Sequence, residues 1–196
     1  MAVTMTGEAT LPAARSKVWA LLNDPEVLKT CIPGCQSLER TGDNGFAAVT
    51  KVKIGPVTAI FKGKVEISDI VPDVAYTIHG EGEGGVAGFA KGGATVSLAD
   101  ASGGTLLRYD VEAQVGGKIA QLGSRLIDGV AKGMADKFFA SFAEEAVKSG
   151  VAQRLAHVEA HVTHHFAAEP QTPAPQVSPP KKKSWLRRIW EWFMSR

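Results

Sequence analysis

The sequence predicts an α+β fold in which an antiparallel sheet curves around one long C-terminal helix. Between residues 46 and 115, turn signals such as Gly55-Pro56 separate segments in which apolar and charged residues alternate, which is typical of an antiparallel sheet with one face in water. Residues 118–148 then carry apolar side chains at helical spacing. A sheet wrapped around this helix would bury the apolar stripe, and such an arrangement commonly encloses a cavity.

The first strand is predicted over residues 2–11 and ends at Pro12. Residues 14–22 follow as a short helix. Its apolar face consists of Val18, Trp19 and Leu22.

A second short helix is predicted from the Asp24-Pro25 pair. Asp24 can cap the helix and Pro25 suits its first position, and the helix extends to about Thr30. The segment CIPGCQSLER then enters a strand, and residues 41–45 form a turn.

Two later segments show the strand alternation most clearly. In the first, Ala59, Phe61, Gly63, Val65 and Ile67 alternate with Thr58, Ile60, Lys62, Lys64 and Glu66. In the second, Leu107, Tyr109, Val111 and Ala113 alternate with Leu106, Arg108, Asp110 and Glu112. One face of the predicted sheet is therefore apolar and the other is mostly charged.

The long helix is predicted to begin after Gly116-Gly117 and to run over about 118–148, with Gly150 as a candidate stop. Its apolar stripe consists of Ile119, Leu122, Leu126, Ile127, Val130, Met134 and Phe138. The predicted order of elements is a strand, two short helices, about six strands and a long helix. This is the order of the helix-grip arrangement.

Four segments follow from these patterns. Residues 1–150 form a helix-grip ligand-binding domain, and residues 151–168 a histidine-rich helical extension. Residues 169–180 hold five prolines in twelve positions and form a linker. Residues 181–196, KKKSWLRRIWEWFMSR, form a short amphipathic helix.

This C-terminal segment has the features of a helix that lies in a membrane interface. Its apolar side chains fall on one arc of the helix: Trp185, Leu186, Ile189, Trp190, Trp192 and Phe193. Its cations are Lys181, Lys182, Lys183, Arg187 and Arg188. The alternative is docking on the protein's own body or on a partner subunit, and the two are compatible.

The charge distribution separates this segment from the body. Residues 1–150 carry 15 Lys and Arg against 17 Asp and Glu, whereas residues 181–196 carry six against one. This uneven distribution indicates that the segment binds an anionic partner. We expect that partner to be an anionic membrane surface. Nucleic acid is disfavoured because no nucleic-acid fold signature accompanies the segment and its tryptophans face away from Arg187 and Arg188.

The sequence predicts a cytoplasmic protein attached peripherally to the inner face of the cytoplasmic membrane. No segment reaches the roughly 18–20 apolar residues of a spanning helix, and the N-terminus lacks the pattern of a secretory signal. The two cysteines, Cys31 and Cys35, fit a reducing compartment.

The stretch GEATLPAARSKVWALLNDPEVLKTCIPGCQSLE resembles the family of carbon monoxide dehydrogenase G subunits, within the START/SRPBCC superfamily. The matching residues are Pro12, Val18, Trp19, Leu22, Asn23, Asp24, Pro25 and the block from Cys31 to Cys35. The glycine-rich GEGEGGVAGFAKGGATVSL and the long final helix are also similar to the family, so the likeness covers about residues 3–148.

The resemblance implies a helix-grip basket with an internal hydrophobic cavity. It also implies an accessory role beside a molybdenum hydroxylase, typically aerobic CO dehydrogenase, outside the three catalytic subunits. As cavity-lining residues we expect Phe61, Tyr76, Phe89, Leu122, Leu126 and Met134, although an ordinary core explains each one almost as well.

Signals for catalysis or metal binding are weak. The only acid–base candidates for a cyclase-like or hydrolase-like activity are Tyr76, His79 and Asp110. The Cys31/Cys35 spacing fits neither thioredoxin-like nor zinc chemistry well, so we expect structural, reduced thiols and no metal site there. His157, His161 and His164 share a helical face, which indicates a solvated edge or, alternatively, a metal-binding face.

The sequence therefore predicts a non-enzymatic adaptor with no covalent cofactor. It would bind a lipophilic ligand, a respiratory quinone or other prenyl lipid, and recruit CO dehydrogenase to the membrane, coupling CO oxidation to the respiratory chain. The alternatives are an assembly or maturation factor for the dehydrogenase and a small-molecule enzyme of the cyclase or hydrolase type.

Overall fold

The structure, a computed structural model, describes the backbone of residues 1–165 and the side chains of residues 1–150. The chain divides into two compact units, residues 1–158 and 159–196, and the fold below is that of the first. Within the described residues, no helix combines the length and the apolar character that crossing a bilayer requires. The linker and the amphipathic helix predicted over residues 169–196 lie outside the described residues.

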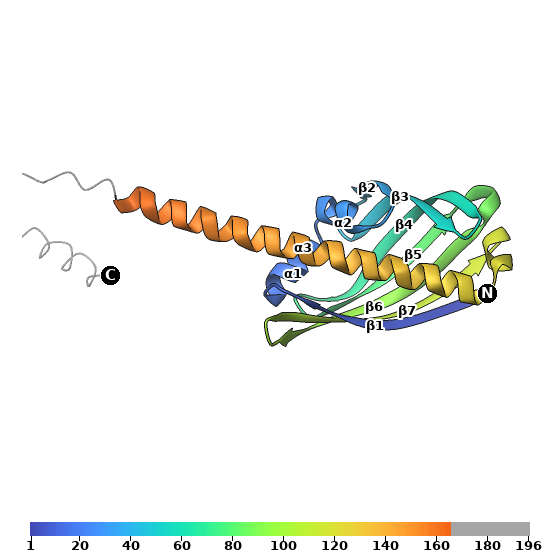
Figure 1. Cartoon of the computed structure of the whole chain (residues 1–196), viewed down its shortest axis with the longest axis horizontal. Helices are drawn as coiled ribbons and strands as arrows, with labels where there is room; N and C mark the ends of the chain where they lie inside the picture. Colours follow the sequence, from blue (N-terminus) through green and yellow to red (C-terminus); the bar gives the residue numbers. More distant parts are fainter. Residues whose placement is uncertain (166–196) are drawn as a thin grey trace, which may run out of the picture. The chain divides into compact units, whose positions relative to one another are not determined.

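Seven strands form one antiparallel sheet, and the long helix α3 lies across one face of it (Figure 1). Along the chain the elements are β1 (Ala2–Leu11), α1 (Arg15–Leu22), α2 (Pro25–Cys31), β2 (Cys35–Arg40), β3 (Gly45–Ile54), β4 (Val57–Val71), β5 (Ala75–Glu83), the short 3-10 helix η1 (Gly85–Ala87), β6 (Phe89–Ala101), β7 (Gly104–Gly116), the 3-10 helix η2 (Lys118–Leu122) and α3 (Ser124–His165). Across the sheet the order is β1-β7-β6-β5-β4-β3-β2. The predicted α+β helix-grip fold is confirmed.

The two short helices form where the sequence predicts them. The Asp24 carboxylate accepts hydrogen bonds from the backbone N–H groups of Glu26 at 2.9 Å and Val27 at 3.4 Å, and Pro25 is the first residue of α2. This cap satisfies donors that the first helical turn leaves without a partner. Helix α1 has no side-chain cap and is held by packing. Its buried residues are Val18, Leu21 and Leu22.

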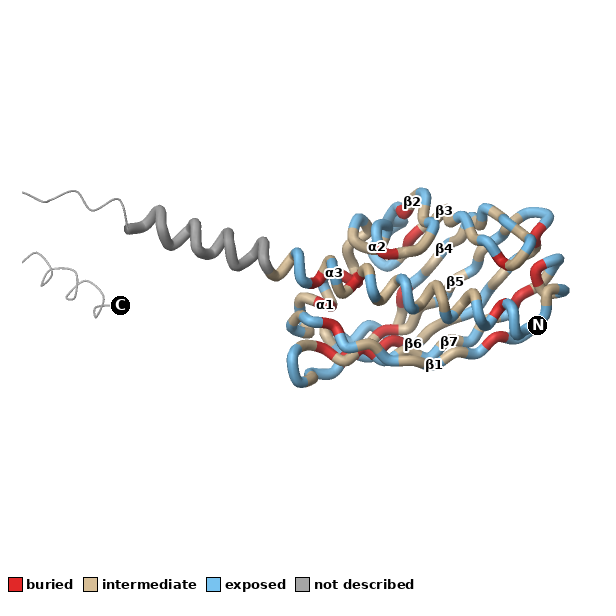
Figure 2. The backbone as a smooth tube through the Cα atoms, viewed as in Figure 1, coloured by how far each residue is buried: buried red, intermediate tan, exposed pale blue. Residues whose placement is uncertain are grey.

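The alternation predicted along β4 is confirmed. The apolar set that includes Val65 and Ile67 faces α3, and Ile67 is only 9% exposed. The charged set faces away, together with Ile60, which is 50% exposed. Because β7 alternates in the same way, the sheet presents an apolar face to the helix. Figure 2 shows the corresponding alternation of exposed residues with buried or half-buried ones along the strands.

The predicted start of the long helix is wrong. Residues Lys118–Leu122 form the 3-10 helix η2, and α3 begins only at Ser124. The break is at Gly123, whose φ of +85° lies in the left-handed region that glycine adopts without strain. At its other end α3 runs through Gly150, the candidate stop, and continues to His165.

Two hydrophobic clusters connect α3 to the sheet. The larger one joins α1 and α2 to the sheet and to the middle of α3, where Phe142 is fully buried. The smaller one lies around the start of α3 and holds Ile54, Ala87, Ile119 and Ile127.

Candidate functional site

An apolar cavity of about 420 Å³ lies between the sheet and α3. This volume falls within the roughly 300–1,000 Å³ of small-molecule sites. The lining residues are Met5, Leu22, Leu28, Ile32, Pro33, Leu38, Phe46, Val65, Ile67, Tyr76, Ile78, Ala94, Val96, Leu107, Tyr109, Val111, Ala131, Met134, Ala135, Phe138 and Phe139. None of these described residues carries a charged side chain.

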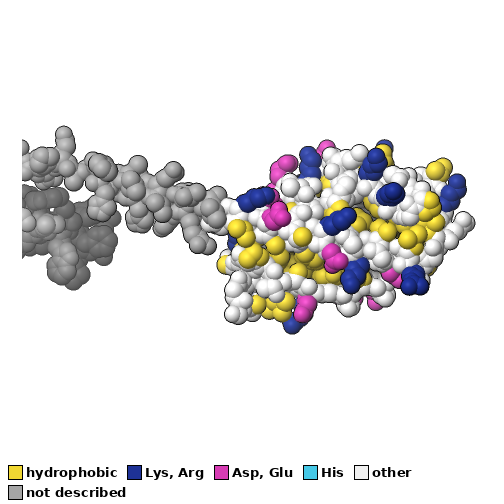
Figure 3. All heavy atoms as spheres, in the orientation of Figure 1, with side chains coloured by type: hydrophobic (Ala, Val, Ile, Leu, Met, Phe, Trp, Pro, Cys, Tyr) yellow, Lys and Arg dark blue, Asp and Glu magenta, His cyan; other side chains and the backbone are white. Residues whose placement is uncertain are grey.

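Small side chains on α3 leave room for the cavity. Ala131 and Ala135 lie one helical turn apart on the face that meets the sheet. Larger residues at these positions would occupy the space between helix and strands. Hydrophobic side chains are gathered on the face that α3 crosses (Figure 3), so the cavity lies beneath a partly apolar surface.

Aromatic rings pack around the cavity. The ring of Trp19 meets Tyr76 edge-on, with centroids 5.5 Å apart, and Tyr109 stacks on Phe139 at 5.3 Å. Phe138 makes an edge contact with Phe139 at 5.2 Å. Such pairs hold their partners in fixed orientations, so this part of the wall is preformed.

Two phenol groups are the only hydroxyl-bearing side chains among the described lining residues, those of Tyr76 and Tyr109. Burial raises the pKa of Tyr76 above its usual range, so its hydroxyl stays protonated. Within residues 1–150, neither phenol takes part in a side-chain hydrogen bond. Both are therefore available to a ligand that carries an acceptor.

The six residues expected to line the cavity lie in three places. Tyr76 and Met134 line it. Phe61 and Leu122 pack against the smaller hydrophobic cluster instead. Phe89 is 44% exposed and Leu126 is 38% exposed, with the Phe89 ring against Gly116 and a Leu126 methyl against Gly55.

Sequence reasoning missed Tyr109, Phe139 and the two alanines as lining residues. Tyr109 belongs to the apolar alternation of β7, so the strand pattern carried the signal. Phe139 follows Ala131 and Ala135 at intervals of four, which is also a helical-face pattern.

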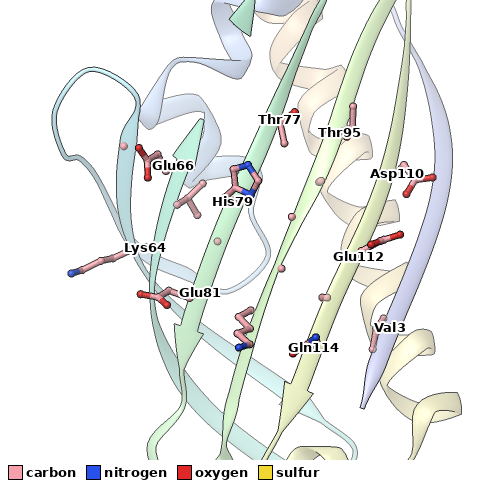
Figure 4. A pocket seen from close by; sticks show the side chains of 18 of the residues that line it. Val3, Lys64, Glu66, Thr77, His79, Glu81, Thr95, Asp110, Glu112 and Gln114 are labelled. Atoms are coloured by element: carbon pink, nitrogen blue, oxygen red, sulfur yellow. The ribbon is translucent and has the colours of Figure 1, made fainter. Parts of the chain in front are cut away.

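The opposite face of the sheet carries a second, polar hollow of about 1350 Å³ (Figure 4). His79 and Asp110 lie there, on β5 and β7, whereas Tyr76 points to the α3 side of the same sheet. The three acid–base candidates are therefore separated by the sheet and do not form one site.

The surroundings of both cysteines favour the neutral thiol over the thiolate. Cys31 is buried, and burial, with Glu145 adding to it, raises its pKa to about 11. Cys35 donates a hydrogen bond to the Ser37 carbonyl at 3.4 Å, and burial raises its pKa as well. No group of metal-ligating side chains occurs among the described residues. The side chains of the histidine cluster lie outside them.

Solved structures of other proteins share this architecture, whereas no curated protein matches the chain. A conserved protein of known structure from Geobacillus kaustophilus is 34% identical, with a TM-score of 0.71, over 75% of this chain and 97% of that one.

More distant structures share the fold alone. Ara h 8.0201 is 17% identical, with a TM-score of 0.53, over 76% of this chain and 99% of its own. The ZhuI aromatase/cyclase from Streptomyces sp. R1128 is 10% identical, with a TM-score of 0.56, over 76% and 95%.

A model of one protein family matches residues 7–147, the part of the chain that builds the sheet and the cavity wall of α3. That family is CoxG, the G subunit of carbon monoxide dehydrogenase. The match covers well over half of the chain and confirms the resemblance noted from the sequence. The chain therefore belongs to the CoxG family of carbon monoxide dehydrogenase G subunits.

Proposed function

We propose that this protein is a non-catalytic accessory subunit that binds a respiratory quinone in its apolar cavity. It recruits a molybdenum-containing CO dehydrogenase to the cytoplasmic face of the membrane and thereby couples CO oxidation to the respiratory chain. The observation that carries the proposal is the cavity itself, a preformed space lined by apolar side chains and two phenols.

A quinone head group matches this lining. Its ring is flat and mostly apolar, so it suits a wall of aromatic and aliphatic side chains, and the stacked pair Tyr109 and Phe139 offers a parallel surface. Its two carbonyl oxygens accept hydrogen bonds, and protonated phenols donate them. A cavity of about 420 Å³ holds the ring and the first part of a prenyl chain, and the rest of a long chain would extend past α3.

Family membership supports the choice of partner. Electrons taken from CO must reach a membrane-embedded acceptor, and quinone is confined to the bilayer. A subunit that binds quinone and attaches to a membrane would bring the two together. The amphipathic pattern of residues 181–196 supports the attachment.

Filling the cavity tests the ligand site. Ala135→Phe adds a ring to a half-buried lining position, so we expect affinity for a short-tailed quinone to fall at least about tenfold, as displacement by a side chain removes the binding volume. Ala140→Phe is the matched control, because Ala140 is exposed on the same helix. The measurement is quinone titration of the purified full chain, with mass spectrometry of its organic extract. Equal affinity in both variants would place the ligand elsewhere.

An assembly factor for the dehydrogenase is the second candidate, and the family match supports it equally. It predicts cofactor-deficient dehydrogenase in a strain lacking this protein. Our proposal predicts active dehydrogenase that is uncoupled from respiration. A cyclase-type enzyme is less well supported, because His79 and Asp110 lie on the far side of the sheet from the cavity.

A further inference from the structure

Three large hydrophobic side chains are exposed around the start of α3. Val86 is 86% exposed, Phe89 44% and Leu126 38%. They belong to the end of the molecule that we term the basic rim, which comprises residues 51–62, 83–91 and 118–128.

Packing brings the three segments of the basic rim together. The smaller hydrophobic cluster joins the β3–β4 turn, η1, η2 and the first turns of α3. A Leu126 methyl lies against Gly55 of the turn, and the Phe89 ring covers Gly116 beside η2. In Figure 1 these segments meet at the end of the sheet where α3 begins.

The fold itself holds Val86 outward. Its neighbour Ala87 is only 4% exposed and anchors the loop in the smaller cluster. The loop is closed by a hydrogen bond of 2.8 Å from the Gly84 N–H to the Gly88 carbonyl, and Gly85 and Gly88 have φ values of +58° and +121°. The exposure of Val86 is therefore set by a tight, glycine-dependent turn.

Charge on the body is concentrated at this end. The basic rim has six Lys or Arg against two Asp or Glu, net +4, whereas the rest of residues 1–150 has nine against fifteen, net −6. Among the described residues, no ion pair includes a cation of the rim. Figure 3 shows Lys and Arg side chains over this end with hydrophobic ones between them.

A second exposed apolar group provides a contrast. Ile70, Val71 and Val74 surround the β4–β5 turn, and Val71 is 52% exposed. Asp69 and Asp73 lie in the same turn, so an anionic surface would repel it. Of these two groups, the basic rim is the one that combines exposed apolar side chains with positive charge.

We propose that the basic rim docks on an anionic lipid surface, with Val86 and Phe89 entering the interface and Lys53, Lys118 and Arg125 facing the lipid phosphates. Apolar side chains that project from a cationic collar match such an interface in both polarity and charge. This contact is separate from the proposed attachment through residues 181–196, and it would place the start of α3 at the bilayer.

The apolar part is tested by Val86→Ser in the full chain, with Val71→Ser as the matched control. The readout is cosedimentation with vesicles of phosphatidylethanolamine and phosphatidylglycerol. We expect Val86→Ser to lower the partition coefficient about tenfold, since a valine side chain no longer leaves water, and Val71→Ser to leave it unchanged. Equal binding by both variants would overturn the proposal.

The charged part is tested by Lys118→Glu with Arg125→Glu, against Lys29→Glu with Lys137→Glu, which changes the net charge equally at exposed positions away from the rim. We expect the rim pair to lower the partition coefficient at least about tenfold on anionic vesicles, and the control pair to leave it unchanged. On vesicles without anionic lipid, we expect no difference between the two pairs. Normal vesicle binding with lost binding to the dehydrogenase would make the rim a protein contact and overturn the proposal.

A third variant separates the rim from the C-terminal segment. Lys181→Gln, Lys182→Gln and Lys183→Gln weaken the segment alone. If these changes abolish binding while the rim variants are silent, attachment through residues 181–196 stands and the rim proposal fails. If the rim variants lower binding and these changes do not, the rim proposal stands and attachment through the segment fails.

Discussion

At the scale of single residues, Tyr76 combines burial with an available donor. It is 5% exposed, its ring is fixed by Trp19, and its raised pKa keeps the phenol protonated. An immobilised neutral donor next to apolar walls recognises a carbonyl oxygen more readily than a charged group, because a charged ligand would lose its hydration without gaining a counter-charge.

Tyr76→Phe tests this donor. The change keeps the ring and its packing and removes one hydrogen bond, which contributes about 1 kcal/mol. We therefore expect quinone affinity to fall about fivefold, with an unchanged free energy of unfolding. Isothermal titration and urea unfolding measure the two quantities, and wild-type affinity in the variant would exclude Tyr76 as a ligand donor.

The buried thiol of Cys31 is expected to make the free energy of unfolding decrease at high pH. Its pKa is raised to about 11 in the folded protein from 9.0, so folding favours the neutral thiol. The contribution is complete below pH 9 and is lost as the pH rises toward 11. We expect the wild-type free energy of unfolding to decrease by up to about 2 kcal/mol more than that of Cys31→Ala over this range. Parallel pH profiles for the two proteins would contradict this account.

At the scale of elements, strand phase was predictable and its interruptions were not. The alternation along β4 and β7 placed Val65, Ile67 and Tyr109 on the apolar face. Phe89 was misplaced although β6 pairs with β5 and β7 in unbroken register from Phe89 onward, so that Phe89 shares the face of Lys91 and Thr95, away from α3. The glycines at positions 88, 92 and 93 interrupt the apolar pattern from which this phase could be predicted.

The long helix shows the same limit. Glycine within a helical pattern costs only about 1 kcal/mol, so Gly123 gave no clear reason to end a helix. The structure shows that its φ is positive, and this separates η2 from α3. Leu122 therefore does not continue the stripe that includes Met134. Leu126 belongs to α3 itself, but its side chain lies against Gly55 of the β3–β4 turn and not in the cavity. The cavity was predictable in outline, and only the lining residues within uninterrupted elements could be named.

Helix α2 contributes Leu28 to the cavity wall, so its cap has a functional consequence. Asp24→Ala removes the acceptor for two backbone N–H groups, and we expect a loss of about 1 kcal/mol in the free energy of unfolding. Asp24→Asn keeps an acceptor oxygen, so we expect its free energy of unfolding to fall much less. Urea titration of both variants makes the comparison, and equal losses would mean that the charge matters more than the cap.

At the scale of the whole molecule, residues 181–196 and the body have separate tasks in our proposal. Removing these residues is expected to release the protein from membranes into the soluble fraction at low salt, because about 1 kcal/mol of attraction per cation and the aromatic face are lost. Quinone binding by the body is expected to be unchanged, since every cavity-lining residue lies before residue 140. Fractionation and quinone titration test the two expectations, and a truncated chain that pellets as before would exclude this segment as the main anchor.

The uneven charge of the body, net +4 at the basic rim and net −6 over the rest of residues 1–150, also affects events before any contact is made. Such a distribution is an electric dipole, and near an anionic surface it experiences a torque that turns the positive end forward. The protein would then arrive already oriented, and productive encounters would be more frequent than a random approach allows. Because this torque acts over about one Debye length, roughly 8 Å at physiological salt, the association rate should fall as ionic strength rises while the dissociation rate changes little.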